Sequence, residues 1–404
     1  MKRILVIGGG ASGMMAAIQA AVRGAQVTIY EKNDRVGKKI LATGNGKCNL
    51  SNTDMDLSNY YCADYNKLAD CFARFSTEDT VTFFENNGLM LKNKDGYLYP
   101  YCEQASAVLD ILRTALKKYN VNVFNGVTDI DLSVKKNGKF TVESSMGRKE
   151  FDSVILACGS KAGMKNAATE GYNYAKQFGH RIIPLEPALV QVRCKEDFFP
   201  SVAGVRCRAK ICLYSNKKMI AFDEGELQLT DYGISGIPVF QISRIIAKEL
   251  KVKKDIIVEI DFVPGMSAKQ WDNFIEKRFA VYQGLTTEEF MTGLLHKKIG
   301  LMLLKKYGIK PGDVLGAHHK ETITLIGKAM KCFTVVPREV NGFEQAQVCS
   351  GGVDFAELTK DMESVNQPGL YICGEMVDVD GKCGGYNLQW AWTSGYIAGV
   401  SAAK

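Results

Sequence analysis

The sequence predicts an α/β protein, and three observations carry this prediction. A short apolar run at residues 4–7 leads through a glycine-rich turn into an apolar helical stretch at residues 14–22. Segments between residues 189 and 263 alternate polar and apolar side chains, as half-exposed strands do. Residues 265–318 carry helical patterns instead. We therefore expect a Rossmann-like domain, an inserted β-rich domain and a small helical lid.

The first strand, turn and helix have the spacing of a dinucleotide-binding unit. Gly8, Gly10 and Gly13 fit the pattern G-x-G-x-x-G, which permits a tight turn, room for a pyrophosphate and close packing of helix on strand. A second strand ends at Glu31, 18 residues beyond Gly13, where an acidic side chain accepts hydrogen bonds from the ribose hydroxyls of an adenosine. The candidate dinucleotide-binding residues of this unit are Gly8, Gly10, Ala11, Ser12, Gly13, Glu31 and Lys32.

The segment that follows, residues 34–52, decides which dinucleotide is expected. It is too polar and too rich in glycine for a core element, and it predicts a loop whose backbone approaches a ligand. A simple NAD-binding fold has no need of such a loop here, whereas the longer FAD needs cover for its ribityl chain and flavin. The candidate cofactor-binding residues of the loop are Lys39, Thr43, Gly44, Gly46, Lys47, Cys48 and Asn49.

Three motifs share their order and spacing with one family of flavoproteins. Residues 37–52 read G-K-K-x-L-x-T-G-N-G-K-C-N-x-S-N, where the family has G-R-K-x-x-x-S-G-G-G-R-C-N-x-T-N. Residues 225–236 and 369–395 resemble its G-E-x-L-F-T-H-x-G-x-S-G and G-L-Y-x-x-G-E-x-L-D-V-D-G-x-x-G-G-Y-N-L-Q-W-A motifs. The chain thus resembles the BaiN-like (YhiN-type) FAD-dependent flavoproteins, which include aminoacetone oxidase-like and bile-acid dehydro-reductase-like members.

Several positions of the chain depart from the family pattern, and four of them are near the expected cofactor or substrate. Lys39 and Lys47 replace or shift arginines, and Asn45 replaces a glycine. Asp231 stands where a histidine is common, and it bears on substrate identity because that strand would border the substrate.

Further elements follow in the order that the resemblance implies. We expect helices at residues 68–87 and 104–119, a strand at 121–127 and a hairpin-like excursion over 139–152. Val127 would place its backbone N–H and C=O against the adenine. The next buried strand resembles the flavoprotein A-T-G motif through Ala157, Cys158 and Gly159, and Gly159 would let the chain turn beside the pyrophosphate.

The domain boundaries follow from the change in pattern. We expect an FAD-binding domain of the two-dinucleotide type at 1–188 plus 334–404, a β-rich substrate domain at 189–263 plus 319–333, and a helical lid at 264–318. Ser267 and Thr286 are suitable N-caps for two helices of the lid.

The C-terminal segment corresponds to the last strand and helix of such flavoproteins. The resemblance implies that Glu375, after Gly374, takes a ribityl hydroxyl. The helix that opens at Gly385 would aim its free N–H groups at the flavin N1 and C2 carbonyl, where reduction places negative charge. Candidate contacts there are Gly374, Glu375, Gly385, Tyr386, Asn387 and Leu388. Tyr386 is a candidate proton donor, on position alone.

The amino-acid composition fits an enzyme that acts on small molecules. The net charge is +7 and the basic residues are scattered, so no nucleic-acid partner is expected. Absence of a long apolar stretch or a signal sequence predicts a cytoplasmic protein that does not enter a membrane. The 12 cysteines are expected to be reduced thiols, and neither they nor the four histidines form a metal set or a triad.

The chemistry expected is hydride transfer through flavin N5. Because no second strand–glycine–helix unit is present in the sequence, NADH or NADPH would visit the flavin only transiently. The favoured hypothesis is a reductase of an activated C=C bond in a hydrophobic, steroid- or bile-acid-like molecule. Two alternatives stay open: an oxidase of a small amino ketone that uses oxygen, and a flavin-containing nucleic-acid-binding or RNA-modifying protein. The oligomeric state is open as well.

Overall fold

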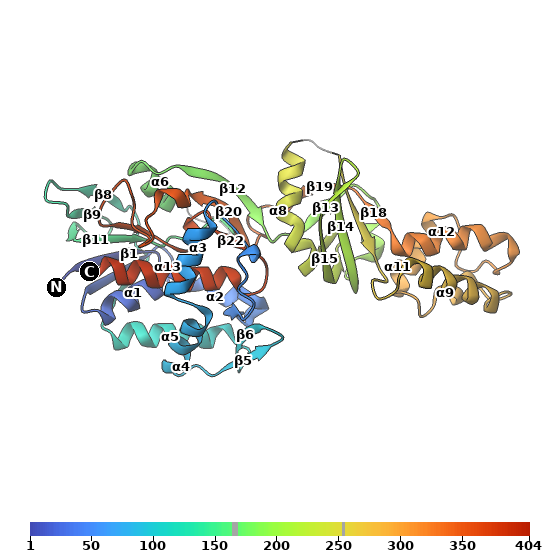
Figure 1. The fold of residues 1–404 in the computed structure, drawn as a ribbon, viewed down its shortest axis with the longest axis horizontal. Helices are drawn as coiled ribbons and strands as arrows, with labels where there is room; N and C mark the ends of the chain where they lie inside the picture. The colour runs from blue at the N-terminus through green and yellow to red at the C-terminus, as the bar shows by residue number, and fades with distance from the viewer. Residues whose placement is uncertain (164–168, 253–254) are drawn as a thin grey trace. The chain divides into compact units, whose positions relative to one another are not determined.

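The computed structural model of the chain describes residues 1–163, 169–252 and 255–404 (Figure 1). This part of the chain divides into two compact units. The first unit comprises residues 1–186 and 347–404, and the second comprises residues 187–346.

A parallel sheet forms the centre of the first unit. In spatial order its strands are β21 (Leu370–Ile372), β11 (Ser153–Leu156), β1 (Arg3–Ile7), β2 (Gln26–Glu31) and β7 (Asn122–Asn125). The middle strands are buried on both faces, which is why β1 reads as an unbroken apolar run rather than an alternating one. Helices α1 (Ala11–Val22) and α5 (Ala105–Lys118) pack on each other beside it. The expected Rossmann-like α/β fold is confirmed.

The smaller elements of the first unit surround this sheet. The helices are α2 (Lys38–Ala42), α3 (Tyr65–Arg74), α4 (Thr77–Asn86) and α6 (Glu170–Gln177). Two small three-stranded sheets have the strand orders β10 (Lys149–Phe151), β9 (Phe140–Glu143), β8 (Asp131–Val134) and β3 (Ser51–Asn52), β6 (Tyr97–Pro100), β5 (Leu91–Lys94). Two further strand pairs are β22 (Asp380–Gly381) with β4 (Tyr60–Tyr61), and β12 (Ile182–Ala188) with β20 (Val348–Val353). The helix expected at 68–87 is wrong as a single element. Phe75 is extended, and Ser76 starts a new helix by a capping box with Asp79.

The last helix, α13 (Tyr386–Ala402), lies directly against α1 (Figure 1). A Cβ added at Gly395 would stand 2.4 Å from the Ser12 carbonyl oxygen, and one at Gly399 would stand 2.2 Å from that of Ala16. Both pairs advance by four residues, so the two helices run in the same direction. The two ends of the chain are thereby joined through a backbone contact that only glycine permits.

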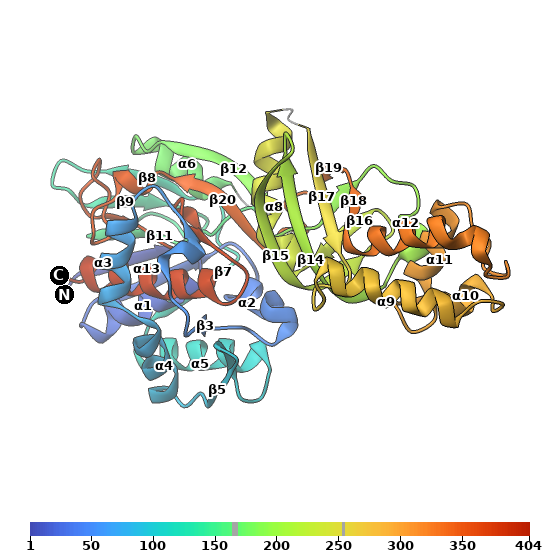
Figure 2. The same ribbon diagram turned by 45° about the vertical axis from the view of Figure 1, so that its right-hand side comes forward.

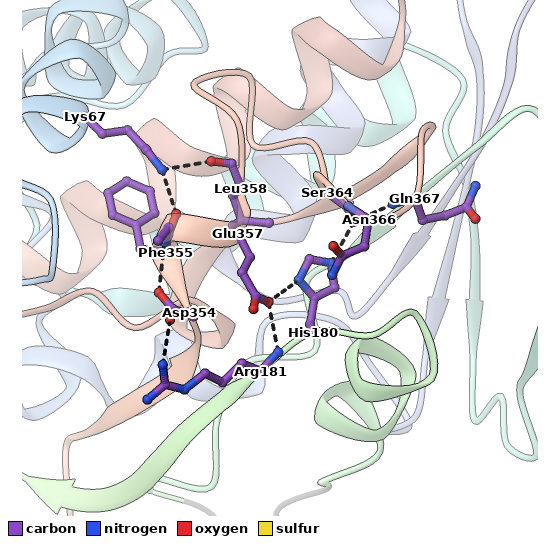
Figure 3. A network of polar contacts seen from close by, with 11 residues as sticks. Lys67, His180, Arg181, Asp354, Phe355, Glu357, Leu358, Ser364, Asn366 and Gln367 are labelled. Atoms are coloured by element: carbon purple, nitrogen blue, oxygen red, sulfur yellow. Dashed lines mark hydrogen bonds and ion pairs between the residues drawn. The ribbon is translucent and has the colours of Figure 1, made fainter.

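A largely buried polar network joins the turn between α6 and β12 to the C-terminal segment (Figure 3). His180 Nδ1 lies 3.0 Å from Glu357 Oε2, and His180 Nε2 lies 2.7 Å from Ser364 Oγ. Glu357, His180 and Ser364 are thus linked like the acid, base and nucleophile of a catalytic triad, an arrangement that the sequence did not suggest. However, Ser364 is 4% exposed and its Oγ accepts hydrogen bonds from the backbone N–H groups of Asn366 and Gln367. A serine enclosed in this way holds the chain together and offers no accessible nucleophile.

The second unit is built on an antiparallel sheet (Figure 2). Its strands, in spatial order, are β18 (Phe333–Val335), β17 (Ile256–Asp261), β14 (Arg206–Ser215), β15 (Lys218–Leu229), β16 (Gly233–Gly236), β13 (Val192–Cys194) and β19 (Pro337–Val340). Its helices are α7 (Phe199–Val202), α8 (Ile237–Lys251), α9 (Ala268–Val281), α10 (Thr287–Met291), α11 (Lys297–Lys306) and α12 (Lys320–Lys331). Ser267 and Thr286 cap α9 and α10, as expected, through capping boxes with Gln270 and Glu289.

One expected boundary needs correction. The FAD-binding domain expected from the sequence includes residues 334–346, but these residues belong to the second unit, because β18 pairs with β17 and β19 pairs with β13. The helices of 268–331 belong to the same unit as the sheet, and their role as a separate lid stays a prediction. In the part of the chain that the structure describes, no helix has the length and apolar character needed to cross a membrane.

Candidate active site

The turn after β1 has the glycine geometry of a phosphate-binding loop. Gly8 has φ +105°, and a Cβ there would stand 2.3 Å from the Ala157 carbonyl oxygen; at Gly13 it would stand 1.9 Å from the Gly8 oxygen. At Gly10, by contrast, no heavy atom of the described chain lies within 4 Å of such a Cβ. The protein itself therefore requires Gly8 and Gly13, while the space beside Gly10 is open to a ligand at the N-terminus of α1.

Glu31 is held at the end of β2 beside this turn. It is 7% exposed, and its Oε2 accepts a hydrogen bond from Gly9 N at 2.7 Å. Its Oε1 accepts from the backbone N and the side-chain Nδ2 of Asn33, at 2.8 and 2.6 Å. Lys32 points elsewhere, to Glu170 at 2.7 Å. The Val127 N–H, expected at the adenine, is donated to the backbone oxygen of Glu31 at 3.0 Å.

The end of β11 approaches the same turn. Gly159 has φ +73°, and no described atom lies within 4 Å of a Cβ placed there. Cys158 donates its N–H to the Met376 sulfur at 3.2 Å, and burial raises the pKa of its thiol to about 12. Together with Ala157 against Gly8, this strand end closes one side of the turn.

An ion pair links the predicted flavin loop to the C-terminal strand. Lys39 Nζ lies 2.5 Å from Glu375 Oε2, and Glu375 Oε1 accepts the Cys349 N–H at 3.0 Å. Gly374, with φ +70°, precedes Glu375 and donates its N–H to Ser394 Oγ at 2.9 Å. The pair fixes the direction of the Glu375 carboxylate. Lys39 would thus act on a cofactor through Glu375 rather than alone.

The loop that was expected to cover the flavin is tightly folded. After α2 it forms a 3-10 turn, Thr43–Gly46, in which Gly44 has φ +56°. Lys47 Nζ pairs with Glu103 at 2.6 Å, and the ammonium groups of Lys47 and Lys92 lower the pKa of Glu103 to about 2. The buried Cys48 thiol has a pKa raised by burial to about 12, which supports packing rather than thiolate chemistry.

The N-terminus of α13 is fixed by contacts with β3 and with the loop that precedes the helix. Gly385 has φ +94°, and a Cβ there would stand 2.5 Å from the Ser51 carbonyl oxygen. The Asn387 amide, a candidate flavin contact, is engaged within the chain. Its Oδ1 accepts from Gly381 N at 2.8 Å, and its Nδ2 donates to Gly381 O at 2.7 Å. Asn387 therefore shapes the preceding loop, while Leu388 follows it as a partly buried residue at the core.

Tyr386 stands at the same terminus among aromatic rings. Its ring centroid lies 5.7 Å from that of Tyr60 in an edge-on arrangement, and Tyr60 Oη donates to the Tyr386 carbonyl oxygen at 3.0 Å. A Cβ added at Gly384 would stand 3.0 Å from the Tyr97 ring and 3.1 Å from the Tyr386 ring. Burial, and then the nearby Asp54 carboxylate, raise the pKa of Tyr386 to about 12. Its hydroxyl therefore keeps its proton at physiological pH.

Sequence reasoning missed the residue that anchors α13. Gln389 is fully buried; its Oε1 accepts from Ser51 Oγ at 2.7 Å and from Thr80 Oγ1 at 3.0 Å. Its Nε2 donates to the Ser76 carbonyl oxygen and to Thr393 Oγ1. A glutamine between the apolar residues Leu388 and Trp390 of a buried helix was the available signal, because such an amide must find partners inside the protein.

These residues fit an FAD molecule. The open space at Gly10 and Gly159 is suited to a pyrophosphate. The contact between Gly395 and Ser12 aligns the two parallel helices. Helix α13 begins nine residues before this contact, whereas α1 begins only one residue before it. At 1.5 Å per residue, the α13 terminus extends about 12 Å further in the same direction. One ligand with phosphates at the first terminus and a second electron-rich group about 12 Å along would meet both positive helix ends.

Fold and site together define the class of FAD-dependent oxidoreductases. The HI0933-like protein Rossmann domain matches residues 2–401, and the chain belongs to this family. The expected resemblance and the enzyme class are thus confirmed.

Three similar proteins cover the whole chain or nearly so. The chain is 43% identical over 412 residues to a 3-dehydro-bile acid delta(4,6)-reductase of Clostridium scindens, with 100% of both chains covered. It is 28% identical over 409 residues to a ribosomal RNA dihydrouridine synthase of Haemophilus influenzae, covering 99% of this chain and 98% of that protein. The solved structure of the 3-ketosteroid delta1-dehydrogenase of Sterolibacterium denitrificans shares the fold, with a TM-score of 0.51, 12% identity and 100% of both chains covered.

Proposed function

We propose that this enzyme reduces a C=C bond conjugated to a carbonyl group in a hydrophobic, steroid- or bile-acid-like small molecule. The observation that carries the proposal is the 43% identity, over the full length of both chains, to a relative named as a bile-acid delta(4,6)-reductase. The site supports it, because the N-terminus of α13 could stabilise the charge of a reduced flavin and the Tyr386 phenol keeps a proton to donate.

FAD, when bound, would supply a hydride from N5 to the carbon β to the carbonyl. The protein's own part is to bind, orient and protonate. The cofactor-binding role of each candidate residue remains part of this proposal. The first turns of α1 and α13 would receive the negative charge of the pyrophosphate and of the reduced pyrimidine edge. Tyr386 would deliver its hydroxyl proton to the carbon α to the carbonyl, so that one hydride and one proton saturate the bond.

The electron donor is proposed to be NADH or NADPH, which would bind and leave with each turnover. In the described residues, β1–α1–β2 is the one strand–glycine–helix unit with dinucleotide spacing. The sheet of the second unit would carry the substrate side, and its helices would act as the lid.

RNA reduction is a second candidate, favoured by a specific observation. The 28% identity to a ribosomal RNA dihydrouridine synthase covers nearly all of both chains. Dihydrouridine forms when the C5=C6 bond of uracil, which is conjugated to the C4 carbonyl, takes up a hydride and a proton. Both candidates therefore ask the same chemistry of the site. The amino-ketone oxidase stays a prediction without such an observation.

Anaerobic stopped-flow absorbance tests the proposal. NADH or NADPH should bleach the yellow protein, and a bile-acid-like 3-oxo-4,6-diene should then restore the oxidised spectrum. Restoration by a uridine-containing rRNA fragment instead would favour the second candidate. Rapid restoration by air alone would favour the oxidase, and no bleaching by either nicotinamide would contradict the reductase.

A further inference from the structure

One side chain at the site has a buried acceptor with no partner. Among the described residues, none donates a hydrogen bond to Asn49 Oδ1, although this atom is buried. A buried carbonyl oxygen left unpaired costs free energy that the same atom recovers when a ligand supplies a donor. The orphaned oxygen therefore indicates a ligand donor at this point.

The position of Asn49 is fixed by its neighbours along the chain. Cys48 adopts φ +57° and donates its N–H to the Thr43 carbonyl oxygen at 3.0 Å. Leu50 donates its N–H to the Leu98 carbonyl oxygen at 2.8 Å. The backbone is thus held on both sides of Asn49, so that the Cα from which its side chain extends is placed before any ligand binds.

This amide lies at the N-terminus of α13. A Cβ built on Gly385 would stand 2.9 Å from Asn49 Oδ1. The other amides near this terminus are already engaged: Asn387 bonds to Gly381, and Asn52 donates from Nδ2 to the Gly384 oxygen and accepts the Asp54 N–H at Oδ1. Asn49 is distinguished from both by its unpaired oxygen.

We infer that Asn49 recognises the pyrimidine edge of the flavin by accepting its N3–H. That edge presents one N–H donor between two carbonyl acceptors, and a carboxamide presents one acceptor beside one N–H₂ donor. The helix terminus serves the N1 and C2 positions, and the Asn49 carboxamide serves N3–H and the adjoining C4 carbonyl. This assignment concerns the cofactor only and does not depend on which substrate is reduced.

A pair of cofactors tests the assignment by binding alone. The apoprotein is titrated with FAD and with 3-methyl-FAD, in which a methyl group replaces the N3 hydrogen, and flavin fluorescence gives each Kd. The unchanged protein should prefer FAD by about tenfold to a hundredfold, the cost of a lost hydrogen bond to a buried acceptor. In Asn49→Ala this preference should fall to within about twofold, since the acceptor is gone.

Asn52→Ala is the matched control, because it removes an amide from the same loop whose oxygen is already paired. It should weaken both cofactors alike and keep the preference for FAD. Equal binding of both cofactors by the unchanged protein, or a preference retained in Asn49→Ala, would overturn the assignment.

A second variant decides the matter if Asn49→Ala does not fold. Asn49→Asp keeps the size and an acceptor but adds a negative charge beside N3. The pKa of the bound flavin N3–H, followed by visible absorbance, should rise relative to the unchanged protein, because deprotonation would place two negative charges together. An unchanged N3 titration would contradict the contact.

Discussion

Single side chains around the site owe their protonation states to burial. Burial raises the pKa of the Cys48 and Cys158 thiols to about 12, and it does the same for the Tyr386 hydroxyl. All three therefore keep their protons at physiological pH. The two thiols are too weakly acidic to act as nucleophiles, whereas a neutral phenol is the form that can donate a proton.

Replacing Tyr386 by phenylalanine should separate the two half-reactions. Re-oxidation of the reduced enzyme by a conjugated ketone should slow by about 10²–10⁴, the usual contribution of a general acid, while reduction by NADPH stays unchanged. Because the pKa of Tyr386 is raised to about 12, the re-oxidation rate of the unchanged enzyme should persist from neutral pH to about 11 and fall only as the proton is lost.

Stopped-flow rates across this pH range check the prediction, with Tyr101→Phe, an exposed tyrosine of the same unit, as the control. A loss of rate near pH 10, or equal rates for Tyr386→Phe and its parent, would remove Tyr386 from the proton path.

Glu31 should matter for cofactor retention more than any neighbouring acid. Its carboxylate bonds both the glycine turn and Asn33, so Glu31→Ala removes a contact to the ribose and loosens the turn. A charged hydrogen bond contributes about 1.5–3 kcal/mol, which corresponds to about tenfold to a hundredfold in Kd. Glu170→Ala, which removes an exposed acid paired with Lys32, should bind FAD as the parent does. If Glu31→Ala and its parent copurify with equal flavin, the ribose lies elsewhere.

At the scale of elements, a feature could be predicted from the sequence when the residues that form it lie close together along the chain. The β1–α1–β2 unit was predictable because its glycines, apolar runs and acid all lie within 32 residues. The break before α4 was missed although Ser76 and Asp79 form a readable capping-box pattern. The Lys39–Glu375 pair was not predictable, because its partners are 336 positions apart and meet only in the folded chain.

The contact of α1 with α13 should tolerate no side chain at its glycines. Gly395→Ala would place a Cβ 2.4 Å from the Ser12 carbonyl oxygen, a rigid backbone atom, so the helices must separate. We expect a loss of about 1–3 kcal/mol in the free energy of unfolding. FAD binding should also weaken, because separating the helices would displace the N-termini of α1 and α13. Gly300→Ala in α11 is the control: the nearest atom is the Met291 Cβ at 3.3 Å, a far milder contact than 2.4 Å to a backbone oxygen, and helix propensity favours alanine. Denaturant melts and FAD titrations of both variants check this; a Gly395→Ala protein as stable as its parent would contradict the packing argument.

Over the whole molecule, most of the net positive charge comes from one segment, although the basic residues themselves are scattered along the chain. Residues 264–332 hold 11 lysines and arginines against 6 acids, a net +5 of the chain's +7. Several of these lysines, such as Lys305 of α11 and Lys328 of α12, lie in the last turn of a helix. There they complement the negative end of the helix dipole, so this part of the excess has a structural role of its own.

The two candidate substrates differ in how they should respond to this charge. If a steroid-like ketone is the substrate, Lys305→Gln and Lys328→Gln should each cost about 0.3–1 kcal/mol of stability and change re-oxidation by the ketone less than about twofold. The same rate should hardly vary with salt, because a ketone of this kind brings no phosphate groups to the protein. An RNA substrate would behave in the opposite way: its binding would fall steeply with salt, and each lysine that contacts a phosphate would reduce the salt slope by about one when removed. Re-oxidation of the reduced enzyme by an rRNA fragment, sensitive to salt and to both lysine variants, would transfer the assignment from the small molecule to RNA.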